Sequence, residues 1–165
     1  MRRYARVLCC ALSMASAGAR AAPDDGGLRI DVPVVLREAK VVFNLDHAAF
    51  VGDEPVGLDF LRIITERFRA DGTKARIVAV FHGEAGYMLL DDAAYDRVRN
   101  WGHGNPYKDQ IAALMRDGVE IEECGQTMKV NRWTNEDLLP GAKVDTGANF
   151  RIIELVQQGY VQIQP

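Results

Sequence analysis

The chain has 165 residues, of which 48% are hydrophobic and 26% are charged, a length and composition that fit one globular domain with a sizeable core. Its net charge of −3 excludes the basic footprint that a nucleic-acid-binding protein carries.

The first 21 residues have the pattern of an export signal. Three arginines lie within the first six residues, and a short apolar run follows over residues 7–17. Residues 19–21, Ala-Arg-Ala, match the small-x-small pattern of a signal-peptidase site. The apolar run is too short to span a bilayer. We therefore expect a cleavable signal peptide over residues 1–21, a mature chain that begins at Ala22, and a location in the periplasm.

Cleavage there would leave a single cysteine. It would remove Cys9 and Cys10 together with four arginines and no acidic residue, so the net charge would change from −3 to −7. The remaining Cys124 could form no internal disulfide, so its thiol would be free, modified or paired with another chain. In an oxidising compartment an idle exposed thiol is a liability, which favours a thiol that is either buried or in use.

The mature chain begins with a lead-in and a buried strand. Residues 22–37 have the proline, glycine and aspartate content of an extended segment. The apolar run within residues 40–45 predicts a strand buried on both faces, and Asp46 and His47 follow its carboxyl end. A helix is expected next, ending at Gly72. Its inward stripe is predicted to contain Leu58, Leu61, Ile64 and Phe68.

A second buried strand is predicted over residues 75–81, with His82 directly after it. Residues 87–90 fit either a short strand or the start of a helix that runs to Arg99. Asn105 and Pro106 then favour the start of another helix, which ends at Gly118.

The stretch from 119 to 130 is predicted to carry the chemistry. Apolar and acidic residues alternate at its start, which is typical of a short strand, and Cys124 lies at the carboxyl end of that strand. Gly125 permits a sharp turn, and Thr127 is suited to cap a following helix. The amides of Gly125, Gln126 and Thr127 would then stabilise a thiolate at Cys124. The alternative is a buried, inert cysteine that only packs.

The last part of the chain predicts one more helix and one more strand. Thr134 and Asp137 resemble a capping box. Asp145 or Thr146 is suited to cap the last helix, and a final strand is expected over residues 160–163. The inward stripe of that helix is predicted to contain Phe150, Ile153 and Val156.

The alternation of strands and helices predicts an α/β fold with a mostly parallel sheet of about five strands and helices on both faces. Ligands bind such sheets in the crevice outside the carboxyl ends of the strands. Asp46, His47, His82 and Cys124 are expected to meet at that edge.

Two histidines are candidates for acid–base chemistry there. His82 is suited to stabilise the Cys124 anion as imidazolium, or to accept the thiol proton as a base. The alternative is a histidine that satisfies backbone groups at the end of a strand. His47 beside Asp46 fits either a second acid–base pair or a solvated pair in a loop.

Several other chemistries find no support in the pattern. The cysteine and the three histidines lack the compact spacing of metal ligands, so no metal is expected. Phosphate-cradling glycine loops are absent, and no serine occurs after residue 21, which excludes a serine nucleophile in the mature chain. No cofactor is needed for the chemistry of a thiol.

Residues 40–165 resemble the DsrE/DsrF-like proteins, especially their exported single-domain members. The resemblance rests on the strand that ends near Asp46 and on a series of short motifs in the same order and spacing. These are Phe81-His82-Gly83, Asn105-Pro106-Tyr107, Gly118-Val119, Cys124-Gly125-Gln126-Thr127, Asp137-Leu138-Leu139-Pro140 and Gly159-Tyr160.

The resemblance implies a three-layer α/β/α fold, homo- or hetero-oligomers, and a role in sulfur metabolism. Sulfur-relay members of the family carry sulfane sulfur as a cysteine persulfide, and some place the reactive cysteine elsewhere in the fold. Here that role falls to Cys124, which implies a periplasmic sulfur carrier or sulfurtransferase with sulfur donor and acceptor proteins as partners. Two alternatives remain: a non-catalytic oligomeric module that binds a small ligand or a partner segment, and a redox-responsive thiol protein.

Overall fold

The computed structural model describes residues 27–165, so the expected signal peptide over residues 1–21 lies outside the described residues. The chain divides into two compact units, residues 1–33 and 34–165, and each is considered by itself. The described part of the first unit contains no helix or strand. Cys124 and the other predicted site residues all lie in the second unit.

The second unit contains a five-stranded parallel sheet in the order β6-β5-β4-β1-β7. Its strands are β1 (Glu38–Leu45), β4 (Lys74–Phe81), β5 (Val119–Cys124), β6 (Lys143–Asp145) and β7 (Val161–Ile163). A separate antiparallel hairpin is formed by β2 (Phe50–Val51) and β3 (Glu54–Pro55). The predicted α/β class and mostly parallel sheet are confirmed.

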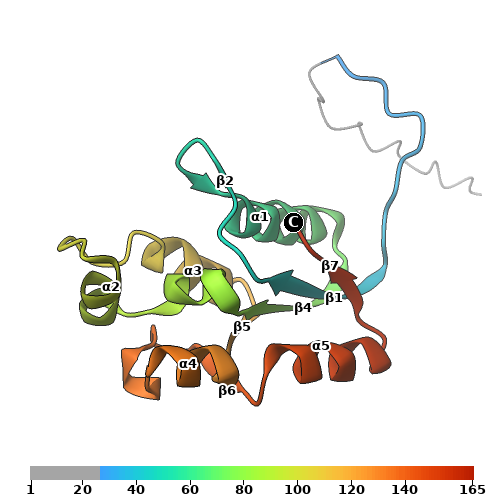
Figure 1. The fold of residues 1–165 in the computed structure, drawn as a ribbon. Coiled ribbons are helices and arrows are strands. Elements are labelled where there is room, and N and C mark those ends of the chain that lie inside the picture. Colours follow the sequence, from blue (N-terminus) through green and yellow to red (C-terminus); the bar gives the residue numbers. More distant parts are fainter. Residues whose placement is uncertain (1–26) are drawn as a thin grey trace, which may run out of the picture. The chain divides into compact units, whose positions relative to one another are not determined.

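Helices cover both faces of this sheet, as Figure 1 shows with α1 and α3 on one side and α5 on the other. The α-helices are α1 (Val56–Asp71), α2 (Asp92–Arg99), α3 (Lys108–Arg116), α4 (Gly125–Asn131) and α5 (Ala148–Gln157). Two 3₁₀ helices, η1 (Gly83–Leu89) and η2 (Asn135–Asp137), lie between them in sequence. Within residues 27–165, no helix has the length and apolar character needed to cross a bilayer.

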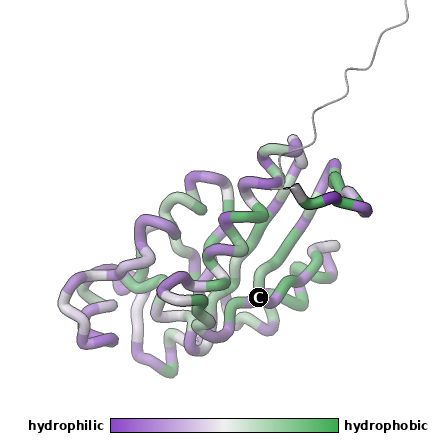
Figure 2. The backbone as a smooth tube through the Cα atoms, turned by 90° about the horizontal axis from the view of Figure 1, so that it is seen from above, coloured by the Kyte–Doolittle hydropathy of each residue, from purple (hydrophilic) through white to green (hydrophobic). Residues whose placement is uncertain are grey.

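The core consists of two clusters separated by the sheet. The larger one packs alternate residues of β1, β4 and β5 against α1, α3 and η1, and the smaller one lies under α5. Figure 2 shows the hydrophobic colour concentrated along the central strands. Cys124 belongs to the smaller cluster, together with Ile152 and Leu155 of α5. The thiol is therefore on the α5 face of the sheet.

The predicted inward stripe of α1 is confirmed. Leu58, Leu61 and Phe68 are buried, and Ile64 is partly buried against the same cluster. The helix ends where Gly72 adopts the left-handed conformation, with φ 69°. A second apolar pair in the same helix, Phe60 and Ile63, is 50% and 49% exposed and is followed on its face by Arg67, so the longer stripe is the one that packs.

The predicted inward stripe of α5 is wrong. Phe150, Ile153 and Val156 are 71%, 55% and 45% exposed, while Ile152 and Leu155 face the sheet. The helix carries two apolar stripes one residue apart, and spacing alone does not tell which one faces the core. Its N-cap is Gly147, without a side-chain hydrogen bond, so neither of the two predicted capping residues holds that position.

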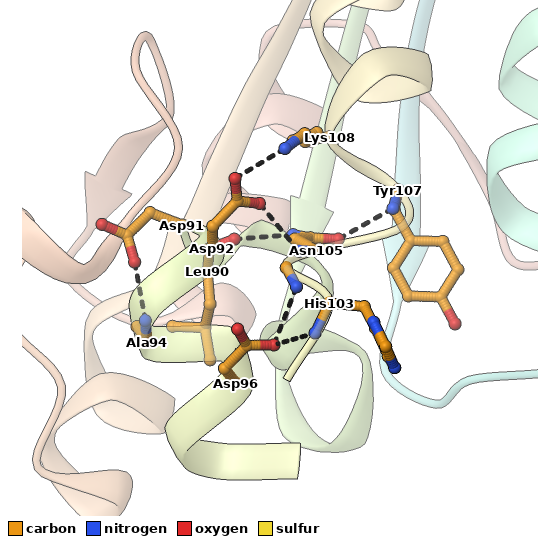
Figure 3. A network of polar contacts seen from close by, with 10 residues as sticks. Leu90, Asp91, Asp92, Ala94, Asp96, His103, Asn105, Tyr107 and Lys108 are labelled. Carbon is orange, nitrogen blue, oxygen red and sulfur yellow. Dashed lines mark hydrogen bonds and ion pairs between the residues drawn. The ribbon is translucent and has the colours of Figure 1, made fainter. Parts of the chain in front are cut away.

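A polar network fixes η1, α2 and the start of α3 to one another, as drawn in Figure 3. The Asn105 side-chain amide donates to the carbonyls of Met88 and Leu90 at 2.8 and 2.6 Å, while its own backbone amide donates to Asp92. Asn105 Oδ1 also accepts from the backbone amide of Tyr107 at 2.8 Å. Residues 87–90, undecided in the sequence, thus belong to the end of η1 and a short link to α2.

Candidate thiol site at the carboxyl edge of the sheet

Cys124 is the last residue of β5 and pairs in register with Asp145 of β6. Its sulfur accepts a hydrogen bond from the backbone amide of Ala148 at 3.3 Å. Ala148 is the first residue of α5, so its amide is one of the helix N–H groups without a partner inside the helix. The sulfur therefore interacts with the amino end of α5, whereas the sequence had pointed to the helix that follows Cys124 directly.

That following helix, α4, begins at Gly125, with Cys124 as its N-cap residue and no side-chain capping bond. A side chain on Gly125 would meet the carbonyl oxygen of Asp145 at 2.5 Å. Glycine at this position lets the chain turn from β5 into α4 while staying close to β6. This close approach keeps the Cys124 backbone within reach of the segment that leads into α5.

His82 lies beside Cys124 at the same edge. Phe81, the last residue of β4, pairs with Glu123 of β5, and His82 follows with an extended backbone, so the register puts His82 level with Cys124 and on the same face. His82 Nε2 donates to Asn44 Oδ1 at 2.7 Å, which leaves the Nδ1 of the neutral ring as an acceptor. Among the described residues, no hydrogen bond joins this imidazole to the thiol.

Burial lowers the pKa of His82, an effect that the carboxylates of Asp46 and Asp145 partly oppose. The ring is therefore neutral near pH 7, because its pKa lies below the ordinary value of about 6.5. A neutral imidazole with a free Nδ1 fits the role of a proton acceptor better than that of a fixed positive charge.

Asp46 and His47 form a pair at the rim of the site. His47 Nδ1 and Asp46 Oδ1 are 2.5 Å apart, and the hydrogen bond from His47 is the main cause that lowers the pKa of Asp46. The side-chain amide of Gln164 also donates to Asp46 at 3.2 Å. The structure thus brings Asp46 close to His82, while His47 is exposed at the outer side.

Gln126 and Thr127 tie α4 to its surroundings. Thr127 Oγ1 accepts from the backbone amide of Gly83 at 2.9 Å, and Gln126 Nε2 donates to the carbonyl of Thr146 at 3.2 Å. These bonds connect α4 to the start of η1 and to the segment before α5. Their direct partners are backbone groups, so both side chains position the loops around Cys124.

A cleft of about 880 Å³ opens at this end of the sheet, between α4 and the η1–α2 region. Gly83, Gln126 and Thr127 line it, but Cys124 and His82 do not. The predicted site residues therefore belong to two places, a buried thiol site and an open cleft. The contact between η1 and α4, made by Gly83 and Thr127, lies in the lining of the cleft.

Glu123 was not predicted as a site residue, and it is the most unusual group near the thiol. Its side chain is 0% exposed, and neither carboxylate oxygen forms a hydrogen bond within residues 27–165. Burial, with a smaller effect of Cys124 and Asp145, raises the pKa of Glu123 to about 9, so the carboxyl is neutral at pH 7. A side chain on Gly86 would meet its Oε1 at 2.7 Å. The sequence contained one sign of this buried acid, which is the pair of consecutive glutamates, Glu122 and Glu123, in a predicted strand.

Its neighbour Glu122 is also buried, on the α5 face. Arg151 of α5 binds it with Nε and Nη2, both at 2.8 Å. Burial raises the pKa of Glu122 although Arg151 opposes the shift. The alternation of apolar and acidic residues predicted the strand but not the burial of this glutamate. The arginine that compensates its charge lies on another element, 29 residues later.

No cluster of three or more His, Cys, Asp or Glu side chains suited to hold a metal occurs in residues 27–165. Cys124, His82 and Glu123 contribute a thiol, an imidazole that is neutral near pH 7 and a neutral carboxyl to this edge.

Comparisons with known proteins agree with this architecture. The model of the DsrE/DsrF-like family matches residues 40–165. A protein of unknown function, MTH1491, from Methanobacterium thermoautotrophicum has 22% identity and a TM-score of 0.57, over 77% of this chain and 99% of its own. The ychN protein from E. coli has 13% identity and a TM-score of 0.55, over 78% of this chain and 99% of its own. At these identities the two structures show a shared fold. No curated protein matches the chain.

Proposed function

The chain belongs to the DsrE/DsrF-like family, and we propose that it is a periplasmic sulfur carrier or sulfurtransferase that binds sulfane sulfur as a persulfide on Cys124. Family membership indicates a function related to sulfur relay. Cys124 would be the nucleophile and His82 the local acid–base group.

The observation that carries the proposal is the contact between the Cys124 sulfur and the Ala148 amide at the amino end of α5. An amide donor and the positive end of a helix dipole both favour a negative sulfur. A persulfide anion would find the same donor. His82, directly after the neighbouring strand β4, is level with the thiol by register, and its Nδ1 has no hydrogen bond within residues 27–165 and can take the proton.

Loading would be a transfer between sulfur atoms. With thiosulfate as donor, the Cys124 thiolate attacks the outer, sulfane sulfur, a new S–S bond forms, and the S–S bond of thiosulfate breaks. Sulfite leaves with the electron pair, and Cys124 keeps one additional sulfur atom as a persulfide anion. The charges balance without an external oxidant.

Access to the sulfur sets a condition on this reaction. Cys124 is 5% exposed and its sulfur contacts the Ala148 amide, so the proposal requires the segment before α5 to move aside for a donor. Gln126 holds that segment through the Thr146 carbonyl, which makes this hydrogen bond a restraint on loading.

Mass spectrometry of the mature protein after exposure to thiosulfate or polysulfide tests the proposal. A mass increase of about 32 Da, one sulfur atom, on the peptide that contains Cys124 is the expected result. A Cys124→Ala variant must show no increase. An unmodified thiol after prolonged exposure, or a thiol-linked adduct of larger mass, would reject the carrier role and support one of the alternatives.

The open cleft favours a second candidate, a non-catalytic module that binds a small ligand. Its volume of about 880 Å³ lies in the range of small-molecule sites, and its lining does not include the thiol. A redox-responsive thiol protein that forms mixed disulfides is the third candidate, and it predicts the larger adduct named above.

The partners and the location are part of the same proposal. The exposed stripe of α5, formed by Phe150, Ile153 and Val156, is the surface that we assign to contacts in a homo-oligomer. Light scattering tests the assembly, and amino-terminal sequencing of protein from the periplasm tests the export and the start at Ala22. A mature chain that begins at Met1 would reject the periplasmic assignment.

A further inference from the structure

The cleft between α4 and the η1–α2 region has apolar walls and one cation. Phe50, Tyr87, Val98, Val130 and Trp133 supply most of the apolar lining. Val130 is 82% exposed and Phe50 and Val98 are 41% exposed, so these walls face solvent in the described part of the chain. Apolar walls of this kind favour a flat, hydrophobic ligand body.

The cation is Arg99, the last residue of α2. Its guanidinium carbon lies 4.2 Å from the centre of the Tyr87 ring, a stacked cation–π arrangement. Tyr87 in turn contacts Tyr95 and Tyr107, with ring centres 5.9 and 6.3 Å away. These aromatic contacts hold the Arg99 side chain in a defined position at the edge of the cleft.

Arg99 makes no ion pair with any acid of residues 27–165, unlike Arg97 in the same helix, which binds Asp137 at 2.6 Å. A second hollow of about 540 Å³ also includes Arg99 and Phe50 in its lining. The guanidinium of Arg99 is therefore accessible from two sides. The guanidinium also donates to the Tyr95 hydroxyl, and as a group with five N–H donors it has further donors for a ligand that brings a planar or tetrahedral anionic group.

The rest of the lining restricts the charge of that ligand. Glu84 contributes one carboxylate, so the charges of the lining residues cancel before a ligand binds. Its other polar side chains, Gln126, Thr127 and Asn131, are neutral. Polyanions such as nucleotides require several cations or a phosphate-binding loop, and this cleft offers one arginine.

We propose that this cleft binds a small organic monoanion with a flat apolar body, whose carboxylate or sulfonate pairs with Arg99 while its body packs between Phe50 and Trp133. The site does not use Cys124, so it is independent of the proposed sulfur chemistry.

Isothermal titration calorimetry with naphthalene-2-sulfonate tests the proposal, with the isosteric, uncharged naphthalene-2-sulfonamide as the matched probe. The sulfonate should bind the full chain at one site. Because a hydrogen bond to a charged group contributes about 1.5–3 kcal/mol, Arg99→Gln should weaken sulfonate binding by about 10-fold or more. Sulfonamide binding should be weaker in the parent and unchanged in Arg99→Gln.

Arg116→Gln is the matched control, because Arg116 is an exposed arginine at the end of α3, outside both hollows. It should bind the sulfonate as the parent does, and Glu84→Gln should bind it more tightly. Equal binding of the two probes, equal loss in Arg99→Gln and Arg116→Gln, or no saturable sulfonate binding would overturn the proposal. Binding that disappears as the protein concentration rises would also overturn it, because it would assign the cleft to a second copy of the chain.

Discussion

The sulfur of Cys124 lies 3.3 Å from the backbone nitrogen of Ala148, which connects the end of β5 to the beginning of α5. The contact joins residues 24 positions apart and combines two roles. It satisfies one of the free amides of the helix, and it places a hydrogen-bond donor on the only cysteine in residues 27–165.

Cys124→Ser tests which of the two roles dominates. The serine hydroxyl still accepts from Ala148 but is a weak nucleophile, so sulfur loading should be lost while the fold remains. Placing a more polar group in the apolar cluster under α5 should lower the free energy of unfolding by about 1–3 kcal/mol. Mass spectrometry and urea unfolding give the two readouts. A serine variant that still gains one sulfur atom would move the loading site away from Cys124.

His82→Ala should slow persulfide formation by about 10²-fold, since it removes the proton acceptor level with the thiol. Loading should remain measurable, because the Ala148 amide still stabilises the sulfur anion. The rate of the mass increase at pH 7 is the measurement, with His103→Ala, an exposed loop residue, as the control. Equal rates in both variants and the parent would leave His82 with a structural role only.

Glu123→Gln should change the pH dependence of stability. The pKa of Glu123 is about 9 in the folded chain, against an ordinary value of 4.5, so between these pH values the folded state holds one proton more than the unfolded state. The parent therefore loses stability as the pH rises through this window, by up to about 1.4 kcal/mol per pH unit. The glutamine variant lacks this loss, so its stability relative to the parent should increase with pH and level off above about pH 9.

Urea unfolding of both proteins at several pH values measures that difference. Glu122 and Asp145, whose pKa values burial also raises, are present in both proteins, so their contributions largely cancel. A constant difference between the two stability curves would mean that the pKa of Glu123 is not raised in the folded chain, which contradicts the prediction.

Gly125→Ala should destabilise the fold at the thiol site. The new methyl group would lie 2.5 Å from the Asp145 carbonyl oxygen, a backbone atom that moves only with β6. A cost of about 1–3 kcal/mol is expected for such overpacking. Gly147→Ala is the matched comparison, because its methyl group would meet the flexible Gln126 side chain at 3.3 Å and should cost less. Thermal unfolding of both variants ranks them, and an equal or reversed order contradicts the prediction.

The two stripes of α5 allow a paired test of packing and assembly. Ile153→Glu should leave the free energy of unfolding of one chain nearly unchanged and abolish the oligomer, because the residue is 55% exposed. Ile152→Ala should instead cost about 2–4 kcal/mol, because Ile152 is buried under the helix. Light scattering and urea unfolding separate the two effects. A parent that is monomeric at all concentrations would leave the exposed stripe without this role.

The sequence predicted those parts of the fold in which the local pattern has one solution. Strands β1 and β4 contain continuous apolar runs, and only one apolar stripe of α1 runs the length of the helix, so both the elements and their faces were predicted correctly. The alternation of strands and helices then placed Cys124 and His82 at the same edge of the sheet. In α5 two apolar stripes lie one residue apart, and only the packing of the helix against the sheet shows which of them is buried.

The details of the thiol site depended on contacts between distant segments. The amide that reaches Cys124 belongs to α5, which approaches the sulfur only because β6 pairs with β5. The burial of Glu122 depends on Arg151, and that of Glu123 on the absence of a side chain at Gly86. None of these partners is adjacent in sequence, so residue spacing carried no signal for them.

The strand order has a consequence for how the protein is made. β1 is the first strand of the sheet to be synthesised, and β7, the last, is its second neighbour. During synthesis the hydrogen-bonding edge of β1 opposite β4 therefore stays open until the final residues have emerged. A chain that stops before Val161 would keep this edge exposed, next to the apolar side chains of β1 and the inner side of α5. A chain that lacks β7 should thus be prone to aggregation through this open edge.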